Sequence, residues 1–171
     1  MRLFIALPVP AELRRTLENA QAALRRQGVR GRFTPAENVH LTLAFLGNVE
    51  DPAPVIKALQ GLRLPRAALT FDRLTAFGDV LVALFKRSGA LDRYVTALRA
   101  ALDEAGVPYD KKAFRPHITL CRKTALPCPD FRLSPSEREL RGLRLPVKEV
   151  RLMSSDLSGE TPQYTAVYTQ R

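Results

Sequence analysis

Hydrophobic and polar positions alternate in two short segments of this chain, and each segment opens with a histidine. Residues 40–43 read His-Leu-Thr-Leu, and residues 117–120 read His-Ile-Thr-Leu. A β-strand points successive side chains to opposite faces. Each segment is therefore predicted to be a half-buried strand that presents its imidazole and its hydroxyl together on one face and its two aliphatic side chains on the other.

These two segments belong to a longer internal repeat. The histidines, which are the only two in the chain, lie 77 residues apart, and a shift by this offset also aligns the apolar runs 3–7 and 80–84. In both halves a segment with apolar residues at helical spacing follows the apolar run. Each half thus has the order strand, helix, connecting segment and histidine strand, which indicates two matched lobes with pseudo-twofold symmetry.

The remaining pattern is rich in strands and short turns. It predicts a helix at 52–60, a hairpin of strands 68–77 and 80–86, an extended connection at 124–146 with one helical turn near 137–140, and closing strands at 148–154 and 164–170. This favours an α+β fold of two pseudo-symmetric lobes, each a mainly antiparallel sheet with helices on its outer face and a groove between the lobes. We expect one bilobal domain over residues 1–171, with repeat units of about 1–78 and 79–171.

Composition narrows the class of protein. Hydrophobic residues make up 46% and charged residues 26% of the chain, as in soluble globular proteins. No apolar run approaches a membrane span, and the opening run, broken by Pro8 and Pro10, does not resemble a signal peptide. We expect a cytoplasmic monomer.

Cys121 and Cys128 form neither a disulfide framework nor a zinc motif. On a regular strand Cys121 would lie on the same face as His117 and could line the groove. Its small size makes it better suited to packing in the core.

The charge balance favours a polyanionic partner. The formal net charge is +10, from 27 basic and 17 acidic residues, and 21 of the basic residues are arginines. Arginine-rich codon usage would explain arginine in place of lysine but not the net excess of positive charge. Guanidinium groups bind phosphate oxygens in a forked geometry, so the excess is typical of proteins that bind nucleotides or nucleic acid.

The paired motifs suit acid–base chemistry on a phosphate ester. An imidazole titrates near pH 6.5, so His40 and His117 could hold or release a proton near neutrality. Cleavage of a phosphodiester needs a base for the attacking oxygen and an acid for the leaving oxygen, on opposite sides of the phosphorus. Thr42 and Thr119 could donate hydrogen bonds to the non-bridging oxygens. This chemistry needs no metal and no cofactor.

Basic and aromatic residues near the motifs are candidates for substrate binding. Arg115 and Arg122 flank the second motif, and Arg32 leads toward the first. Arg122 has the opposite parity to His117, so it enters the groove only if the strand bends or ends there. Phe33 and Phe114 are equally suited to stacking on a base and to packing in the core. Phe45 shares the parity of the aliphatic motif residues and is predicted to lie in the core.

With both motifs in view, the sequence resembles the two-histidine phosphoesterase superfamily, and within it the bacterial and archaeal RNA 2′,3′-cyclic phosphodiesterases, once called 2′-5′ RNA ligases. The resemblance rests on residues 1–6 (Met-Arg-Leu-Phe-Ile-Ala), 37–47 (Glu-Asn-Val-His-Leu-Thr-Leu-Ala-Phe-Leu-Gly) and 114–122 (Phe-Arg-Pro-His-Ile-Thr-Leu-Cys-Arg). It covers most of the chain. Two positions depart from the family pattern. The family often has tryptophan where this chain has Phe33, and a small residue such as alanine where this chain has Cys121.

The resemblance implies a hydrolase that opens an RNA-terminal 2′,3′-cyclic phosphate to a 2′-phosphomonoester without a metal. It implies that His40 is the proton donor to the leaving 3′ oxygen and that His117 is the proton acceptor that activates water. It further implies that Thr42 and Thr119 hold the phosphate oxygens. The pseudo-symmetry of the two motifs cannot by itself assign the donor and the acceptor.

Three other functions remain open from the residues alone. The same groups could join a cyclic phosphate to a 5′-hydroxyl, which is 2′-5′ RNA ligase activity. They could also cleave intact RNA by transphosphorylation if the groove has room on both sides of the phosphorus. A non-catalytic RNA-binding module would account for the charge, but it would not require two equivalent His-x-Thr pairs.

Overall fold

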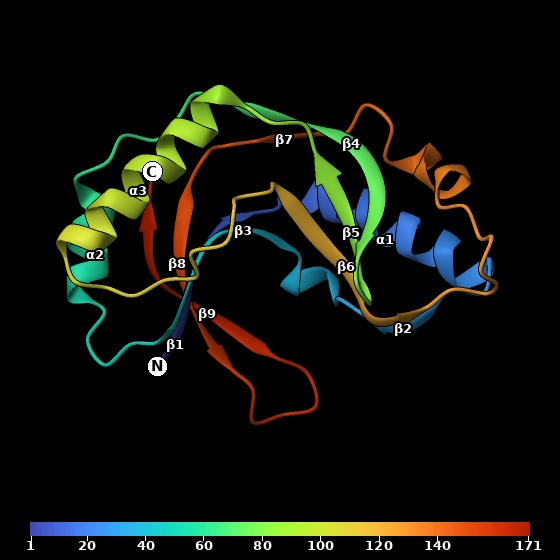
Figure 1. The fold of residues 1–171 in the computed structure, drawn as a ribbon, viewed down its shortest axis with the longest axis horizontal. Helices are drawn as coiled ribbons and strands as arrows, with labels where there is room; N and C mark the ends of the chain where they lie inside the picture. The colour runs from blue at the N-terminus through green and yellow to red at the C-terminus, as the bar shows by residue number, and fades with distance from the viewer.

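One curved antiparallel sheet runs through the computed structural model, which describes all 171 residues (Figure 1). The strands follow the order β7-β4-β5-β6-β3-β1-β8-β9, and β2 pairs with β6. Their bounds are β1 Arg2–Pro8, β2 Arg30–Phe33, β3 His40–Asn48, β4 Ala68–Phe77, β5 Val80–Phe85, β6 His117–Ala125, β7 Arg144–Pro146, β8 Val150–Asp156 and β9 Gln163–Gln170. The helices are α1 Ala11–Arg26, α2 Ala53–Gln60 and α3 Gly89–Glu104, with 3₁₀ turns η1 Ala36–Asn38 and η2 Ser134–Glu139. The predicted α+β class is confirmed.

Most predicted elements are found close to their expected bounds. The short helix, the hairpin and the closing strands all form, and β8 begins two residues later than the pattern predicts. The extended connection holds a 3₁₀ turn and the strand β7, which is only three residues long. A strand of that length is too short to show an alternating pattern, so periodicity cannot predict it. No helix combines the length and the apolar character that a bilayer crossing needs.

The two halves of the sequence exchange their helices. Helix α1 belongs to the first half, yet Gln21 Nε2 donates a hydrogen bond to the carbonyl of Leu120 in β6 at 3.0 Å. Helix α3 belongs to the second half, yet it is tied to the first: Tyr94 Oη donates to Gln170 Oε1 at 2.6 Å, and Gln170 Nε2 donates to the carbonyl of Leu59 in α2 at 2.8 Å. Figure 1 shows α1 on the side of β4, β5 and β6, and α2 and α3 on the side of β8 and β9. Each lobe therefore contains parts of both halves, and a single cluster of 35 buried residues forms the core.

Strand register refines the internal repeat. Pro8 in β1 pairs with His40, whereas Leu84 in β5 pairs with His117. Pro8 and Leu84 lie 76 residues apart, one fewer than the histidines. The gap-free alignment of residues 3–7 on 80–84 is therefore wrong by one residue.

Candidate active site

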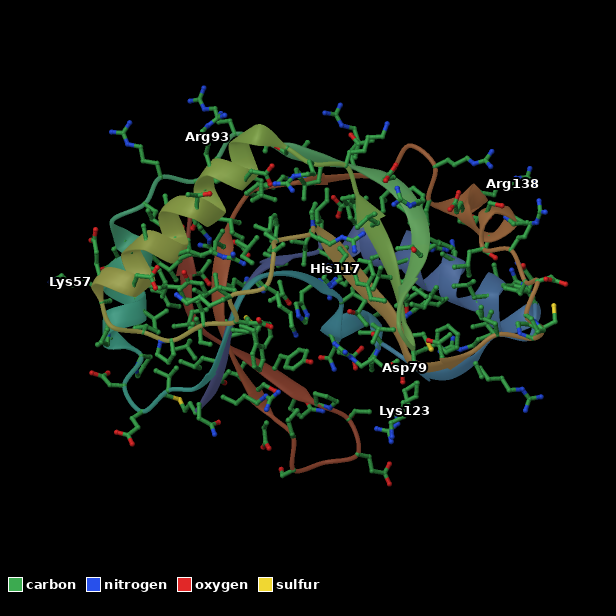
Figure 2. All side chains as sticks on the ribbon, viewed as in Figure 1. Lys57, Asp79, Arg93, His117, Lys123 and Arg138 are labelled. Carbon is green, nitrogen blue, oxygen red and sulfur yellow. The ribbon has the colours of Figure 1, made fainter.

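The two histidine strands meet at their first residues. Strands β3 and β6 are antiparallel neighbours, and Leu41 pairs with Ile118. One step along this register in each direction sets His40 beside Thr119 and Thr42 beside His117. Paired side chains on one face of a sheet lie about 5 Å apart at Cβ. The alternation that the sequence predicts thus gathers both imidazoles and both hydroxyls on one patch, near the centre of the molecule where Figure 2 labels His117.

A small cavity of about 90 Å³ lies over this patch. Seven of the eight residues that line it are polar or charged, and they come from both lobes: Thr34, Asn38, His40, Thr42, His117, Thr119, Arg122 and Tyr164. The volume suits a phosphate group, whose bulk is a few times that of a water molecule at about 30 Å³. The four predicted catalytic residues are therefore brought together around one cavity.

Both imidazoles are held in the same way by the backbone. His40 Nδ1 lies 2.7 Å from the carbonyl oxygen of Asn38, and His117 Nδ1 lies 2.6 Å from that of Arg115. A carbonyl oxygen can only accept, so each Nδ1 carries the proton and donates it. In the neutral ring Nε2 then has the free lone pair, which fixes the tautomer that a general base needs.

Aromatic rings pack against each histidine. The His40 ring lies 4.8 Å from the Phe4 ring and 5.4 Å from the Tyr164 ring, between centroids. The His117 ring lies 5.2 Å from the ring of Phe77, nearly perpendicular to it. These contacts restrict ring rotation and remove water from the sides of both imidazoles.

The surroundings lower the pKa of both histidines below the ordinary value of 6.5. For His40, burial is the main cause, and the positive charges of Arg122 and His117 act in the same direction, while the hydrogen bond to Asn38 opposes them. For His117, burial again lowers the pKa most, followed by the charges of Arg115 and Arg122. The free site therefore favours neutral imidazoles, and a bound anion would oppose this effect.

A β-bulge brings Arg122 into the cavity. Against β5, Thr119 pairs with Val82 and Cys121 pairs with Leu81, so β6 carries one extra residue at this point. The bulge reverses the alternation beyond it, and Arg122 lines the cavity beside Thr119. The bulge meets the condition that the sequence set for Arg122, which was expected to enter the groove only if the strand bends or ends there.

The same bulge turns Cys121 into the core. Cys121 is completely buried and pairs with Phe33 in β2 as well as with Leu81 in β5. Phe33 consequently lies on the core face, where the guanidinium of Arg25 covers its ring at 4.2 Å. Neither Phe33 nor Cys121 lines the cavity. The sequence-based preference for Cys121 as a packing residue agrees with its burial, whereas Phe33 is not brought to the site.

Arg32 lies next to the site without lining it. It pairs with Arg122 across β2 and β6, so the two side chains share a face of the sheet, but Arg32 is exposed and does not border the cavity. Arg32 therefore adds positive charge to the rim.

A second pocket of about 260 Å³ adjoins the cavity at Thr42 and His117. Three phenylalanines contribute to it, together with both basic and acidic side chains: Phe45, Phe77, Phe114, Arg99, Lys112, Arg115 and Asp110. The guanidinium of Arg115 stacks on the Phe77 ring at 4.3 Å. The predicted residues Phe114 and Arg115 are thus found in this neighbouring pocket, which we call the aromatic pocket.

The prediction that Phe45 lies in the core is wrong. Strand β3 has the same bulge as β6, because Thr42 pairs with Ala6 while Ala44 pairs with Ile5. The alternation reverses at Leu43, and Phe45 reaches the aromatic pocket, where it is only partly buried. Equivalent bulges in β3 and β6 thus turn both Phe45 and Arg122 to the face that carries the histidines.

Sequence reasoning missed several cavity residues. Tyr164 comes from β9, more than 120 residues after His40, and no local motif marks it. Asn38 fixes the hairpin that carries Tyr164, because its Nδ2 donates to the carbonyl of Pro162 at 2.8 Å. Thr34 is held by its backbone N–H, which donates to the carbonyl of Leu120 at 2.9 Å. Only the proximity of Thr34 and Asn38 to the first motif could have suggested them.

Comparisons with known proteins agree with this geometry. A family model described as LigT like phosphoesterase matches residues 7–83 and 86–164. The RNA 2′,3′-cyclic phosphodiesterase of Thermus thermophilus is 37% identical, over 98% of this chain and 88% of that protein. The protein of the same name from Escherichia coli is 32% identical, over 78% of this chain and 80% of its own length.

Solved structures show the same fold. The crystal structure of E. coli LigT complexed with 3′-AMP superposes with a TM-score of 0.80 and 27% identity, covering 99% of this chain and 96% of that one. The complex of E. coli LigT with NADP⁺ gives a TM-score of 0.77 at 26% identity and the same coverage. The fold, the paired histidine strands and these matches over nearly the whole chain lead to one conclusion: this protein belongs to the LigT-like phosphoesterase family.

Proposed function

We propose that this chain hydrolyses 2′,3′-cyclic phosphates at RNA ends. The observation that carries the proposal is the pair of imidazoles on one cavity of about 90 Å³, each with Nδ1 fixed by a backbone carbonyl and Nε2 left for proton transfer. The names of the relatives from T. thermophilus and E. coli support the same substrate class.

In the proposed reaction the two histidines act on opposite sides of the phosphorus. Neutral His117 accepts a proton at Nε2 from water, whose oxygen forms a bond to phosphorus. Protonated His40 gives its Nε2 proton to the 3′ oxygen as the P–O3′ bond breaks, and a 2′-phosphomonoester results. The assignment of donor and acceptor rests on the family resemblance. Each transfer is expected to contribute about 10²–10⁴-fold to the rate.

The hydroxyls and Arg122 are assigned to the phosphate oxygens. Thr42 and Thr119 stand beside the opposite histidine in the register of β3 and β6, so each hydroxyl can donate to a non-bridging oxygen. The guanidinium of Arg122 supplies positive charge at the cavity wall. These donors would stabilise the charge that grows on the phosphoryl oxygens in the transition state. We expect this set of protein groups to act without a metal ion or cofactor.

We assign the nucleoside next to the cyclic phosphate to the aromatic pocket. This pocket shares Thr42 and His117 with the cavity, so a phosphate in the cavity would leave its attached ribose and base beside Phe45 and Phe114. Phenylalanine rings bind bases by stacking with little preference for sequence. Arg115, which already stacks on Phe77, would close one side of the pocket.

The test is an incubation of a short RNA that ends in a 2′,3′-cyclic phosphate, in EDTA, with the position of the product phosphate read by ³¹P NMR. We expect a 2′-phosphomonoester as the main product. A 3′-phosphomonoester would reverse the assignment of the leaving oxygen. A second RNA with a 5′-hydroxyl, added to the same reaction, measures ligation. We expect joining to be minor, because water greatly outnumbers RNA ends, and a predominance of joined product would make the ligase the better description.

A further inference from the structure

A basic hollow lies on the outer side of helix α3, and it shares no residue with the catalytic cavity. Its volume is about 450 Å³. Arg63 and Arg66 reach it from the loop between α2 and β4, and Arg93 reaches it from α3. Its other lining residues are apolar or aromatic: Leu62, Pro65, Ala90, Tyr94 and Ala97. The hollow thus combines three guanidinium groups with an apolar floor.

The three arginines have no carboxylate partner. Arg63, Arg66 and Arg93 are exposed, and none of them takes part in any of the ion pairs of the structure. The acidic residue next to Arg93 in sequence, Asp92, pairs instead with Arg87 at 3.0 Å. No acidic residue lines the hollow. Its positive potential is therefore not neutralised by the protein, and it is suited to attract an anion.

The beginning of α3 adds to this potential. Ala90 belongs to the first turn of this 16-residue helix, and Arg93 directly follows that turn. The guanidinium of Arg93 folds back over that turn, because its Nη1 lies 3.4 Å from the position that a Cβ would take at Gly89. A helix N-terminus carries about half a positive charge, and here that charge lies beside the arginines.

The positive charge continues beyond the hollow. Lys86 and Arg144 are neighbours of the same residue, Thr70 in β4. The backbone N–H of Lys86 donates to the carbonyl of Thr70 at 2.8 Å, and Thr70 pairs with Arg144 in β7. Lys86 and Arg144 are both exposed and unpaired. In Figure 2 nitrogen-tipped side chains follow one another along the upper edge of the molecule, from Arg93 towards the lobe that carries Arg138. A row of cations suits a chain of phosphates better than a single anion.

Helix α3 connects this edge with the substrate site. Arg99 lines the aromatic pocket, and Arg93 lines the hollow six residues earlier on the same helix. A rise of 1.5 Å per residue separates them by about 9 Å along the helix axis. Their side chains leave the helix in directions about 120° apart, so a strand that leaves the aromatic pocket would pass around this one helix to reach the hollow.

We infer that Arg63, Arg66 and Arg93, extended by Lys86 and Arg144, form a surface that binds the phosphate backbone of single-stranded RNA upstream of the reacting end. We call it the α3 arginine surface. The inference rests on the proposed function for its choice of RNA as the partner. It predicts that long RNA substrates bind more tightly than a cyclic mononucleotide, which cannot reach this surface.

The test compares the triple variant R63Q/R66Q/R93Q with the wild-type protein on two substrates, a 2′,3′-cyclic mononucleotide and a 12-nucleotide RNA with the same cyclic end. The variant should keep kcat/KM for the mononucleotide. It should raise KM for the 12-nucleotide RNA roughly tenfold. It should also reduce the slope of log K against log salt concentration by about 2, because each of the three lost phosphate contacts contributes about 0.7. The control variant R15Q/R132Q/R138Q removes three exposed arginines from α1, η2 and the loop before η2, which carry none of the five residues of the surface and where no ion pair holds them. An unchanged KM for the RNA in the first variant, or an equal rise in the control, overturns the inference.

Binding of a 12-nucleotide RNA that ends in a 3′-hydroxyl, measured by fluorescence anisotropy, separates the two proposals. If the wild-type protein hydrolyses no cyclic phosphate, the proposed function fails, and weaker binding of this RNA by the triple variant still supports the surface. If cyclic phosphates are hydrolysed but both proteins bind this RNA equally, the surface fails alone. Loss of affinity for inorganic tripolyphosphate without loss of affinity for RNA would also overturn it, because it would identify the surface as a site for small anions.

Discussion

Phe45 and Arg122 occupy equivalent positions in the two histidine strands. Each lies five residues after its histidine and directly beyond a β-bulge that turns it to the face on which the histidines lie. The backbones repeat, but the side chains differ, since Arg122 borders the small cavity and Phe45 borders the aromatic pocket. The pseudo-symmetric framework thus gives the site a charged end and an aromatic end, and so a direction in which a nucleotide can lie.

This asymmetry predicts different kinetic effects at the two positions. R122Q should lower kcat about 10²-fold, because it removes charge stabilisation from the transition state. F45A should instead raise KM about tenfold with little change in kcat, because base stacking contributes about 1–3 kcal/mol in both the ground and the transition state. Steady-state kinetics on a cyclic mononucleotide measure both. R32Q is the control for lost charge, since Arg32 shares the face of Arg122 outside the cavity, and an equal loss of kcat in R32Q would contradict the role of Arg122.

The threonine hydroxyls are expected to act on the rate and not on folding. T42V and T119V keep the size and branching of the side chain but remove the donor, so each should lower kcat about 10²-fold. T42S and T119S should restore most of the rate, because they return the hydroxyl. Thermal unfolding of the four variants provides the check on folding. Valine variants with normal kcat would remove the hydroxyls from the mechanism.

The pH dependence of kcat/KM is predicted to be a bell with its maximum below about pH 6.5, since the pKa values of His40 and His117 are both lowered in the free site. Activity falls on the acid side as His117 gains a proton and on the alkaline side as His40 loses one.

R122Q removes a charge that lowers both pKa values, so its profile should move to higher pH. The kcat profile of the wild-type protein should also lie at higher pH, because bound phosphate favours the imidazolium form. A kcat/KM maximum near pH 8 would be inconsistent with the described site.

The close contact of β2 with β6 predicts a strong effect of G31A on stability. A Cβ at Gly31 would lie 2.6 Å from Cys121 Sγ, 2.8 Å from the carbonyl oxygen of Arg122 and 2.9 Å from that of Lys123. G78A is the control for a positive φ in open space, because Gly78 has a φ of +62°, against +147° at Gly31, and no neighbour within 4 Å of its Cβ position. Chemical denaturation should show a loss of about 1–2 kcal/mol for G78A and a further loss of about 1–3 kcal/mol for G31A. Equal losses would mean that the close contact carries no free energy of its own.

The sequence pattern was sufficient to predict the paired strands and the face on which both histidines lie. Alternation over His40–Leu43 and His117–Leu120 holds because each bulge falls at the last residue of its segment. The wrong placement of Phe45 and the conditional placement of Arg122 both come from a bulge that reverses the alternation, and no residue in either segment marks that position. The exchange of α1 and α3 between the lobes and the arrival of Tyr164 from β9 depend on tertiary packing, which periodicity does not encode.

The most direct test is the rate of hydrolysis of a 2′,3′-cyclic mononucleotide in EDTA by the wild-type protein, H40Q and H117Q. We predict full activity for the wild-type protein and a loss of at least about 10²-fold in kcat/KM for each variant. The double variant should be little slower than the slower single variant, since acid and base act in one step. Near-normal turnover in both single variants, or a wild-type protein that EDTA inactivates, would contradict catalysis by two histidines.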